Sequence, residues 1–245
     1  MTSARDHDII WPYGVKPPPR GRDLPYDDGE PMETPNHRWQ MNLLCEVFEH
    51  AARANGHENA FVGGNMAFCY SSLQINRNDF ESPDVFVVLD AIDNPDRPSW
   101  VLWEEDQRTP NVVVELLSPT TEKNDRGPKF RVYEQLLKVD NYFLYDPMDH
   151  RFEGWQLGAQ GYEALIPDAD GRLDCRAVGR KLGRWQGTFS GRTNNWLRLF
   201  DADGRLTRTY TEAAVAQANA ETERANAAEA ELAALRAELA KRGAT

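Results

Sequence analysis

A single acidic residue interrupts an otherwise apolar run, and this run strongly constrains the fold. Residues 111–119 read Asn-Val-Val-Val-Glu-Leu-Leu-Ser-Pro, a pattern typical of a short β-strand. Side chains alternate along a strand, so Glu115 shares one face with Val113 and Leu117, and three apolar side chains occupy the other face. Because both faces are apolar, we expect this strand inside a sheet that is covered on both sides.

Glu115 also predicts a functional site. Burying an unpaired ionised carboxylate costs several kcal/mol, so such a group needs a cation, a hydrogen-bond network or a raised pKa. A bound divalent metal ion would supply the cation. A structural ion pair with a nearby arginine or lysine would serve equally well, and the strand by itself does not distinguish the two.

The composition predicts one main soluble domain. The chain has 245 residues, of which 40% are hydrophobic and 10% aromatic. Charged residues precede only a short apolar patch near the N-terminus, and no apolar run reaches transmembrane length, so we expect a cytoplasmic protein that does not enter a membrane. Cys45, Cys69 and Cys175 are far apart and lack C-x-x-C spacing, which favours reduced thiols over disulfides or a zinc site.

The charge is unevenly distributed. The net charge of -11 argues against a protein that coats nucleic acid non-specifically. Residues 79–106 contain nine acids against Arg97 alone, and this segment either attracts cations or is solvated. Residues 172–208 contain nine basic and three acidic residues, a net of +6, which allows a basic surface. Charges scattered over hairpin exteriors are the more common outcome for such a stretch.

The chain divides into three parts. Residues 1–32 are rich in proline and predict an extended arm, residues 33–210 predict the main domain, and residues 211–245 predict a helix. Within the main domain, Thr34 and Pro35 open an amphipathic helix that ends at Asn55, and a second helix is expected from Gly127 to Lys138. Strands, the later ones antiparallel additions to the sheet, are expected at residues 60–70, 84–90, 111–117, 141–145, 152–157, 162–166 and 196–200.

The C-terminal helix carries a seven-residue repeat. One seam consists of Ala218, Ala225, Leu232 and Leu239, and the companion seam of Ala214, Glu221, Ala228 and Leu235. Such spacing is typical of a coiled coil, and we expect self-association into a homo-oligomer through residues 225–242. A solvated single helix is the alternative, because several seam positions are alanine or glutamate.

Three residues in order could form a catalytic constellation. If the strands that carry Asp84 and Glu115 are neighbours, their carboxylates can hold Mg²⁺ or Mn²⁺, with Lys129 facing them from the first turn of the second helix. Tyr133 lies one turn further on the same face. Each residue also has a structural interpretation: Asp84 as a turn former at the strand start, and Lys129 as a solvent-facing helix residue.

This order of residues resembles a known family. Pro83-Asp84, the run Glu115 to Thr121, Asp125, Lys129, Tyr133 and Tyr145-Asp146-Pro147 are similar to the Uma-two family, which is classed with restriction endonucleases in the PD-(D/E)XK nuclease-like superfamily. The resemblance covers roughly residues 24–210. It implies an α/β (α+β) fold of the PD-(D/E)XK restriction-endonuclease-like type: a mixed sheet flanked by helices, with extra antiparallel strands and a C-terminal coiled-coil helix.

The resemblance also implies roles for individual residues. Asp84 and Glu115 would be metal ligands and Lys129 the catalytic lysine, with Ser118, Asp125 and Tyr133 in support. Glu46 is a further candidate for an outer acid. One position departs from the superfamily pattern, in which the lysine follows the acid by two residues, because that position is Leu117. Lys129 fits only if its helix folds back over the sheet.

Several other signals favour structural roles. His37 near the first helix start could approach the site, but a cap or surface role is the more common one. Ser118 does not lie in a G-x-S-x-G elbow, so we expect it to organise the strand exit rather than to act as a nucleophile. Trp155, Trp185 and Trp196 could stack on bases, although packing under hairpins is the more frequent use of tryptophan.

The preferred function is metal-dependent hydrolysis of phosphodiester bonds in DNA. A non-catalytic protein that keeps the nuclease fold for assembly or nucleic-acid binding is the first alternative, and it explains the acidic composition better. A metal-dependent enzyme that acts on a smaller phosphoester is the second.

Overall fold

The computed structural model describes residues 19–20, 24, 34–72, 80–92, 94 and 96–242. The arm predicted for residues 1–32 lies almost wholly outside them. Two described residues of that stretch contact the domain: the Pro19 carbonyl accepts a hydrogen bond from Trp103 Nε1 at 3.1 Å, and Leu24 is buried beside Cys69.

The first helix, α1 (Pro35–Ala54), confirms the prediction. Thr34 caps it, since Thr34 Oγ1 accepts a hydrogen bond from the His37 backbone N–H at 3.2 Å, and Pro35 occupies the first turn, where its missing N–H costs nothing. The helix ends before Gly56, whose φ of 91° suits glycine. Its buried face includes Leu43, Leu44, Val47, Phe48 and Ala51.

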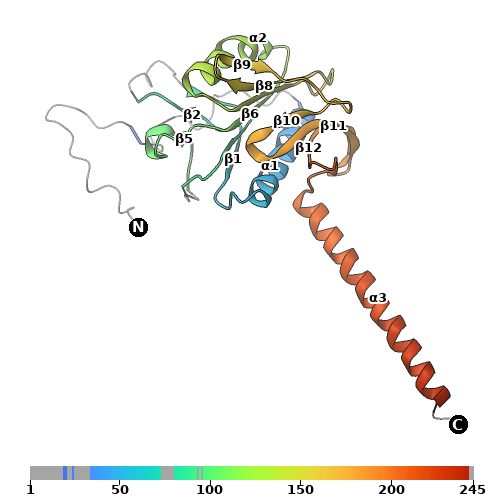
Figure 1. Ribbon diagram of the computed structural model, residues 1–245. Coiled ribbons are helices and arrows are strands. Elements are labelled where there is room, and N and C mark those ends of the chain that lie inside the picture. The colour runs from blue at the N-terminus through green and yellow to red at the C-terminus, as the bar shows by residue number, and fades with distance from the viewer. Residues whose placement is uncertain are drawn as a thin grey trace, which may run out of the picture.

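A mixed six-stranded sheet forms the centre of the molecule (Figure 1). Only the β6–β7 pair is parallel among its pairings, and the others are antiparallel. The strand order is β1 (Phe61–Gly64), β4 (Val85–Val88), β6 (Val112–Leu116), β7 (Asn141–Tyr145), β8 (Phe152–Gly158) and β9 (Gly161–Ala164).

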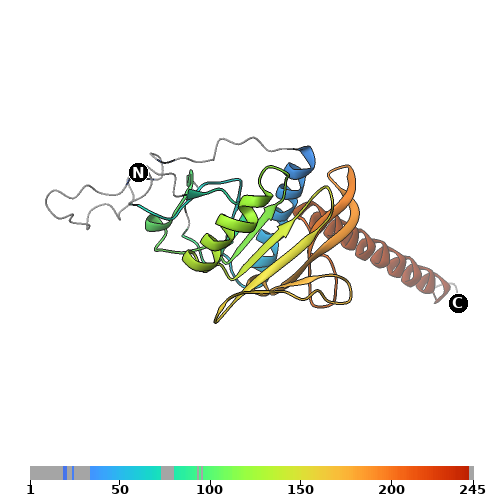
Figure 2. The ribbon, with the colours of Figure 1, turned by 90° about the horizontal axis from the view of Figure 1, so that it is seen from above.

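Both faces of this sheet are covered, as the apolar strand predicts. One face packs against α1 and a second, antiparallel sheet made of β10 (Leu173–Cys175), β11 (Arg180–Phe189) and β12 (Arg192–Phe200). The other face packs against residues 122–136, here called the site helix, so that the strands lie between it and α1 (Figure 2). In β6, Val112, Val114 and Leu116 belong to the first core and Val113 to the second, as does Leu117, which directly follows the strand.

Several strand predictions need correction. Residues 60–70 form two short strands in different sheets, β1 and β2 (Phe68–Cys69), because the chain turns at Asn65, which has a φ of 46°. β2 pairs with β3 (Phe80–Glu81) and β5 (Trp100–Val101). Strand β11 was not predicted, because its glycines and charged residues obscure the alternation of apolar and polar side chains. Strands β10, β11 and β12 form a separate sheet, whereas the later strands were expected to extend the central one.

The site helix begins at Glu122 rather than at Gly127. It consists of α2 (Glu122–Asn124) and two π-helical stretches, η4 (Asp125–Lys129) and η5 (Val132–Leu136). Ser118 Oγ accepts a hydrogen bond from the Thr121 N–H at 3.1 Å and holds the chain just before the helix. Pro128 lies inside the helix, where the wider π turn accommodates a residue without an N–H. Lys129 therefore lies beyond the first turn, and the prediction that it occupies the first turn is wrong.

The connection between β4 and β6 is held by a buried ion pair. Arg97 binds both oxygens of Glu105, with Nε–Oε1 and Nη2–Oε2 distances of 2.6 and 3.0 Å. The guanidinium also lies 4.5 Å from the Phe61 ring centroid and 4.6 Å from that of Trp100. The Arg97–Glu105 pair thus forms a clasp inside this connection.

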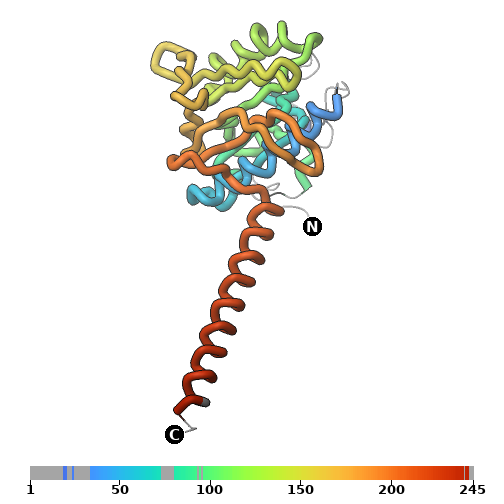
Figure 3. Tube along the Cα trace, turned by 90° about the vertical axis from the view of Figure 1, so that its right-hand side faces the viewer, coloured from blue at the N-terminus to red at the C-terminus, as the bar shows by residue number. Residues whose placement is uncertain are grey.

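The C-terminal helix, α3 (Tyr210–Arg242), confirms the helical prediction and projects away from the domain (Figure 3). Its start is fixed by a capping box, in which the Glu212 N–H donates to Thr209 Oγ1 at 3.1 Å and the Thr209 N–H donates to Glu212 Oε2 at 2.8 Å. The fully buried Arg198 binds the same Glu212 carboxylate at 2.8 Å.

Two further expectations concern membranes and cysteines. Of the helices that the structure describes, none combines the length and apolar character needed to cross a bilayer. Cys45, Cys69 and Cys175 are free thiols, as their spacing predicts.

Two glycines give a matched prediction for stability. A Cβ added at Gly63 would lie 2.2 Å from the buried Phe86 ring, so Gly63→Ala should lower the unfolding free energy by about 1–3 kcal/mol. A Cβ at Gly127 meets nothing within 4 Å, and Gly127→Ala should raise it by up to about 1 kcal/mol, because glycine is a poor helix former. Urea denaturation measures both, and equal effects of the two variants would contradict this packing.

Candidate functional site

The structure brings Asp84 and Glu115 together on adjacent antiparallel strands. Asp84 directly precedes β4, and its backbone N–H donates to Glu115 Oε2 at 3.2 Å. In return, the Leu116 N–H donates to Asp84 Oδ2 at 2.8 Å. Each carboxylate is thus fixed by the strand that carries the other, and Glu115 is only 1% exposed.

Lys129 reaches the same point from the site helix, which folds back over the sheet. Its Nζ lies 3.1 Å from Glu115 Oε1 and 3.1 Å from Asp125 Oδ1. Tyr133 OH donates to Glu115 Oε1 at 2.9 Å from one turn further on. The alternative position two residues after the acid holds Leu117, which is buried in the apolar core. The site helix thus brings Lys129 and Tyr133 to Glu115.

Burial dominates the electrostatics of the carboxylate cluster, which we define as Asp84, Glu115 and Asp125. Burial raises the pKa of Glu115 well above its usual value, and the charges of Asp125 and Asp84 add to this, while Lys129 and Tyr133 oppose it. Burial likewise raises the pKa of Asp125. Burial would lower the pKa of Lys129, but the carboxylates outweigh it and raise that pKa. Glu115 and Asp125 therefore share Lys129, while Asp84 lies against His37, and the excess of acids over lysines favours a proton or a further cation.

His37 belongs to the site, although a cap or surface role was favoured for it. Its Nε2 lies 2.7 Å from Asp84 Oδ1, while Thr34 provides the helix cap. A signal for this was present in the sequence, because His37 precedes Gln40 and Leu44 at helical spacing and so lies on the buried face of α1.

The remaining candidates divide between the site and the scaffold. Asp125 holds Lys129, and its backbone carbonyl accepts a hydrogen bond from Tyr142 OH at 2.9 Å. Ser118 organises the strand exit, as expected, through its hydroxyl contacts with Thr120 and Thr121. Glu46 is not brought to the site. Its carboxylate accepts the N–H of Tyr210 at the start of α3.

The tryptophans and several basic residues of the stretch 172–208 make contacts within the domain. Trp196 is buried, Trp155 packs against Phe130 and Tyr142, and the Arg198 guanidinium lies 4.9 Å from the ring of Trp185. Acids also neutralise several of the basic residues: Lys181 pairs with Asp168, Arg205 with Asp203, and Arg198 with Glu212.

The donor set fits a hard divalent cation that keeps much of its water. Mg²⁺ prefers oxygen ligands and is commonly bound through one or two carboxylates. Asp84 and Glu115 supply such oxygens, each with more acceptor capacity than its present hydrogen bonds use. Among the described residues, no group of three His, Cys, Asp or Glu side chains is already arranged to hold a metal ion.

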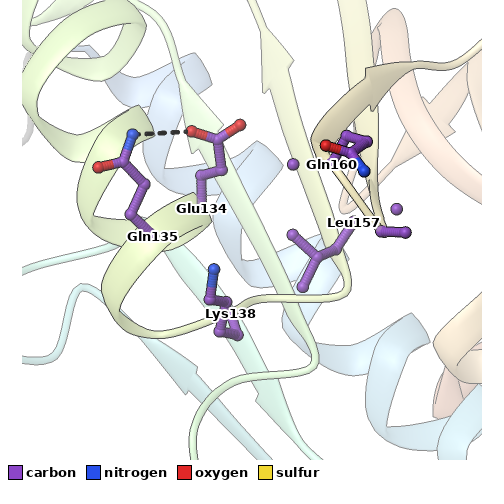
Figure 4. Close-up of a pocket in the computed structure, with 8 residues that line it drawn as sticks. Glu134, Gln135, Lys138, Leu157 and Gln160 are labelled. Carbon is purple, nitrogen blue, oxygen red and sulfur yellow. Dashed lines mark hydrogen bonds between the residues drawn. The ribbon is translucent and has the colours of Figure 1, made fainter.

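A separate hollow of about 450 Å³ lies between the end of the site helix and the β8–β9 turn (Figure 4). Glu134, Lys138 and Gln160 line it. Glu134 is already engaged, because Oε1 accepts the Tyr162 N–H at 2.8 Å and Oε2 accepts from Gln135 at 3.2 Å. The described residues that line this hollow do not include the carboxylate cluster.

The raised pKa of Glu115 predicts how stability depends on pH without metal. Between the ordinary value of 4.5 and the raised pKa, the folded chain binds more protons than the unfolded chain, so the unfolding free energy falls as pH rises. Each unit of pKa difference corresponds to about 1.4 kcal/mol. Glu115→Gln removes this titration, so the wild-type chain should lose stability relative to the variant as pH rises above 4.5. Urea denaturation in chelator measures the difference, and a relative gain by the wild type would contradict the assignment.

Two comparisons with known proteins bear on this geometry. The sequence profile of the Uma2 family, described as "Putative restriction endonuclease", matches residues 13–183. A Synechocystis protein described as uncharacterized is 30% identical over 125 residues, which cover 49% of this chain and 62% of that protein. The chain thus spans a little under two thirds of the relative's length.

Proposed function

The chain belongs to the Uma2 family, and from this membership and the geometry of the site we propose that it is a metal-dependent endonuclease that hydrolyses phosphodiester bonds in DNA. The observation that carries the proposal is the convergence of Asp84, Glu115 and Lys129 from two neighbouring strands and one helix. Carboxylates outnumber lysines at this point, and the excess negative charge favours the binding of a divalent cation.

In this proposal Asp84 and Glu115 hold Mg²⁺ or Mn²⁺ through their oxygens. When bound, the ion would lower the pKa of a coordinated water and so supply a nucleophile near neutral pH. His37 fixes the orientation of the Asp84 carboxylate, and Tyr133 fixes that of Glu115. These contacts hold both acids in place before substrate arrives.

Lys129 supplies positive charge beside the reacting phosphate. Its ammonium remains protonated at neutral pH, because the neighbouring carboxylates raise its pKa despite its burial. A fixed cation at this point would stabilise the charge that develops on the phosphoryl oxygens. Asp125 keeps the ammonium directed at the site through its own 3.1 Å contact.

A cleavage assay tests the proposal. The purified chain is incubated with supercoiled plasmid, single-stranded DNA and a small chromogenic phosphodiester, each with Mg²⁺, with Mn²⁺ and with chelator. We expect nicking or cleavage of DNA that requires the metal and far exceeds turnover of the small diester.

The other outcomes are equally informative. Turnover of the small diester without DNA cleavage would favour the smaller-phosphoester alternative. A chain that cleaves nothing with either metal, yet is folded by circular dichroism, would overturn the proposal in favour of a non-catalytic scaffold. Cleavage that persists in chelator would contradict the role of the metal.

A further inference from the structure

Helix α3 leaves the domain as a single unsupported rod (Figures 1 and 3). Its 33 residues span roughly 50 Å at 1.5 Å per residue. The Arg198–Glu212 pair and the Glu46–Tyr210 hydrogen bond fix only its first turn to the domain. Its leucines are largely exposed: Leu232 to 48%, Leu235 to 52% and Leu239 to 67%. A helix that is anchored at one end and exposes leucines at the other fits a partner along its distal half.

The exposed leucines follow the seven-residue repeat of a coiled coil. Leu232 and Leu239 occupy successive a positions, and Leu235 occupies the d position between them. Ala225 and Ala228 continue the same seam toward the domain. The seam is therefore apolar from Ala225 to Leu239. The next seam position on each side is charged: Glu221 toward the domain and Arg242 toward the C-terminus, both at d.

The charges that flank this seam complement a second copy of the same helix. In a parallel pair, each g residue faces the e residue that lies five positions later on the partner. Arg224 at g then meets Glu229 of the second copy, and Glu231 at g meets Arg236 of the second copy. Glu229, Glu231 and Arg236 make no ion pair within the described part of the chain, so they are available for these contacts.

The antiparallel alternative fits less well. Aligning the leucines of two antiparallel helices places Glu231 opposite Glu238 of the second copy, twice by symmetry. In the same alignment Glu229 faces Arg236 of the second copy, also twice, so the attractive pairs do no more than offset the repulsive ones. Because e and g charges set the orientation of a coiled coil, the sequence favours the parallel arrangement.

We propose that α3 is the interface of a parallel two-stranded coiled coil between two copies of this chain, closed over residues 225–242. This inference goes beyond the proposed nuclease activity and does not depend on it. A parallel pair places both α/β domains at the same end of the rod.

The mass of the full chain in solution tests the interface. Sedimentation equilibrium at micromolar concentration should give twice the chain mass of 27.9 kDa. The double variant Leu232→Glu/Leu235→Glu should be monomeric, with an unchanged domain, because both side chains are exposed in the single chain. Ile166→Glu is the matched control, since Ile166 is 90% exposed on the domain, and this variant should remain dimeric. A monomeric wild type, a mass of three or more chains, or a dimer that survives the double leucine variant would overturn the proposal.

Charge exchange and cross-linking test the orientation. Glu229→Arg should weaken dimerisation about tenfold by replacing two attractive pairs with two repulsive ones, and the added Arg224→Glu change should restore it. Leu235→Cys should give a disulfide-linked dimer on oxidation, because d residues face each other only in a parallel register. The native thiols should not compete: Cys69 and Cys175 are buried, and burial raises the pKa of Cys45 to about 12. A dimer without this cross-link, or without charge rescue, would overturn the parallel orientation.

Discussion

Asp84→Asn is expected to reduce metal-dependent DNA cleavage by about 1,000-fold while leaving the fold intact. The loss follows from the ion, which contributes several kcal/mol to the reaction, where each 1.4 kcal/mol is a factor of ten. The fold should survive because an asparagine oxygen can still accept the Leu116 N–H and its amide can still meet His37 Nε2. Cleavage rates measure the loss of activity, a calorimetric titration with Mn²⁺ measures the loss of metal binding, and circular dichroism checks the fold.

His37→Gln is the matched comparison for this variant. It removes the imidazole from Asp84 Oδ1 but leaves the carboxylate charge in place, so metal binding should weaken by only about 10- to 100-fold, as for other residues that orient a ligand. Full cleavage by Asp84→Asn, or a larger effect of His37→Gln than of Asp84→Asn, would remove Asp84 from the metal site.

Lys129→Met should impair both stability and cleavage. Without the ammonium, Glu115 and Asp125 remain buried without their cation, and breaking a buried pair in this way costs about 3–5 kcal/mol. Uptake of a proton by Glu115 limits the loss, so we expect the lower end of that range in chelator at pH 7. Cleavage should fall by about 100- to 1,000-fold, the effect of removing one fixed donor from developing charge.

Mg²⁺ provides an internal check on this second variant. The ion would replace part of the missing positive charge, so Mg²⁺ should stabilise Lys129→Met more than it stabilises the wild-type chain. Lys123→Met is the control, because Lys123 is exposed on the same helix and should change neither property. Equal effects at both lysines would show that the buried contact has no special role.

The elements that carry the site could be predicted where local pattern and burial agree. The alternation of the apolar run placed Glu115 on the face with Val113 and Leu117, and the cap at Thr34 located α1. The convergence of Lys129 and Tyr133 on Glu115 also followed, because residues four apart share a helix face. Whether Glu115 pairs with lysine or with metal could not be decided from the sequence. The structure shows the lysine, and the metal is a proposal.

The features that escaped prediction depend on contacts distant in the chain. Pro128 is normally a sign of a helix start, and only the π-helical turn lets it lie inside one. The polar strand β11 is extended because it pairs along almost its whole length with β12. His37 and Asp84 are separated by 47 positions, so their contact follows from how α1 packs on the sheet.

The Arg97–Glu105 clasp has a consequence for chain entropy. β4 and β6 are adjacent strands, yet the 23 residues 89–111 separate them, and closing a flexible loop costs more entropy as it lengthens. The buried ion pair joins residues only eight positions apart and so divides that loop into shorter ones. Once the clasp has formed, less conformational freedom remains to be lost when the two strands meet. The approach of the Asp84 and Glu115 carboxylates, which repel each other, is thus assisted by an ion pair that lies in the connection and not in the site.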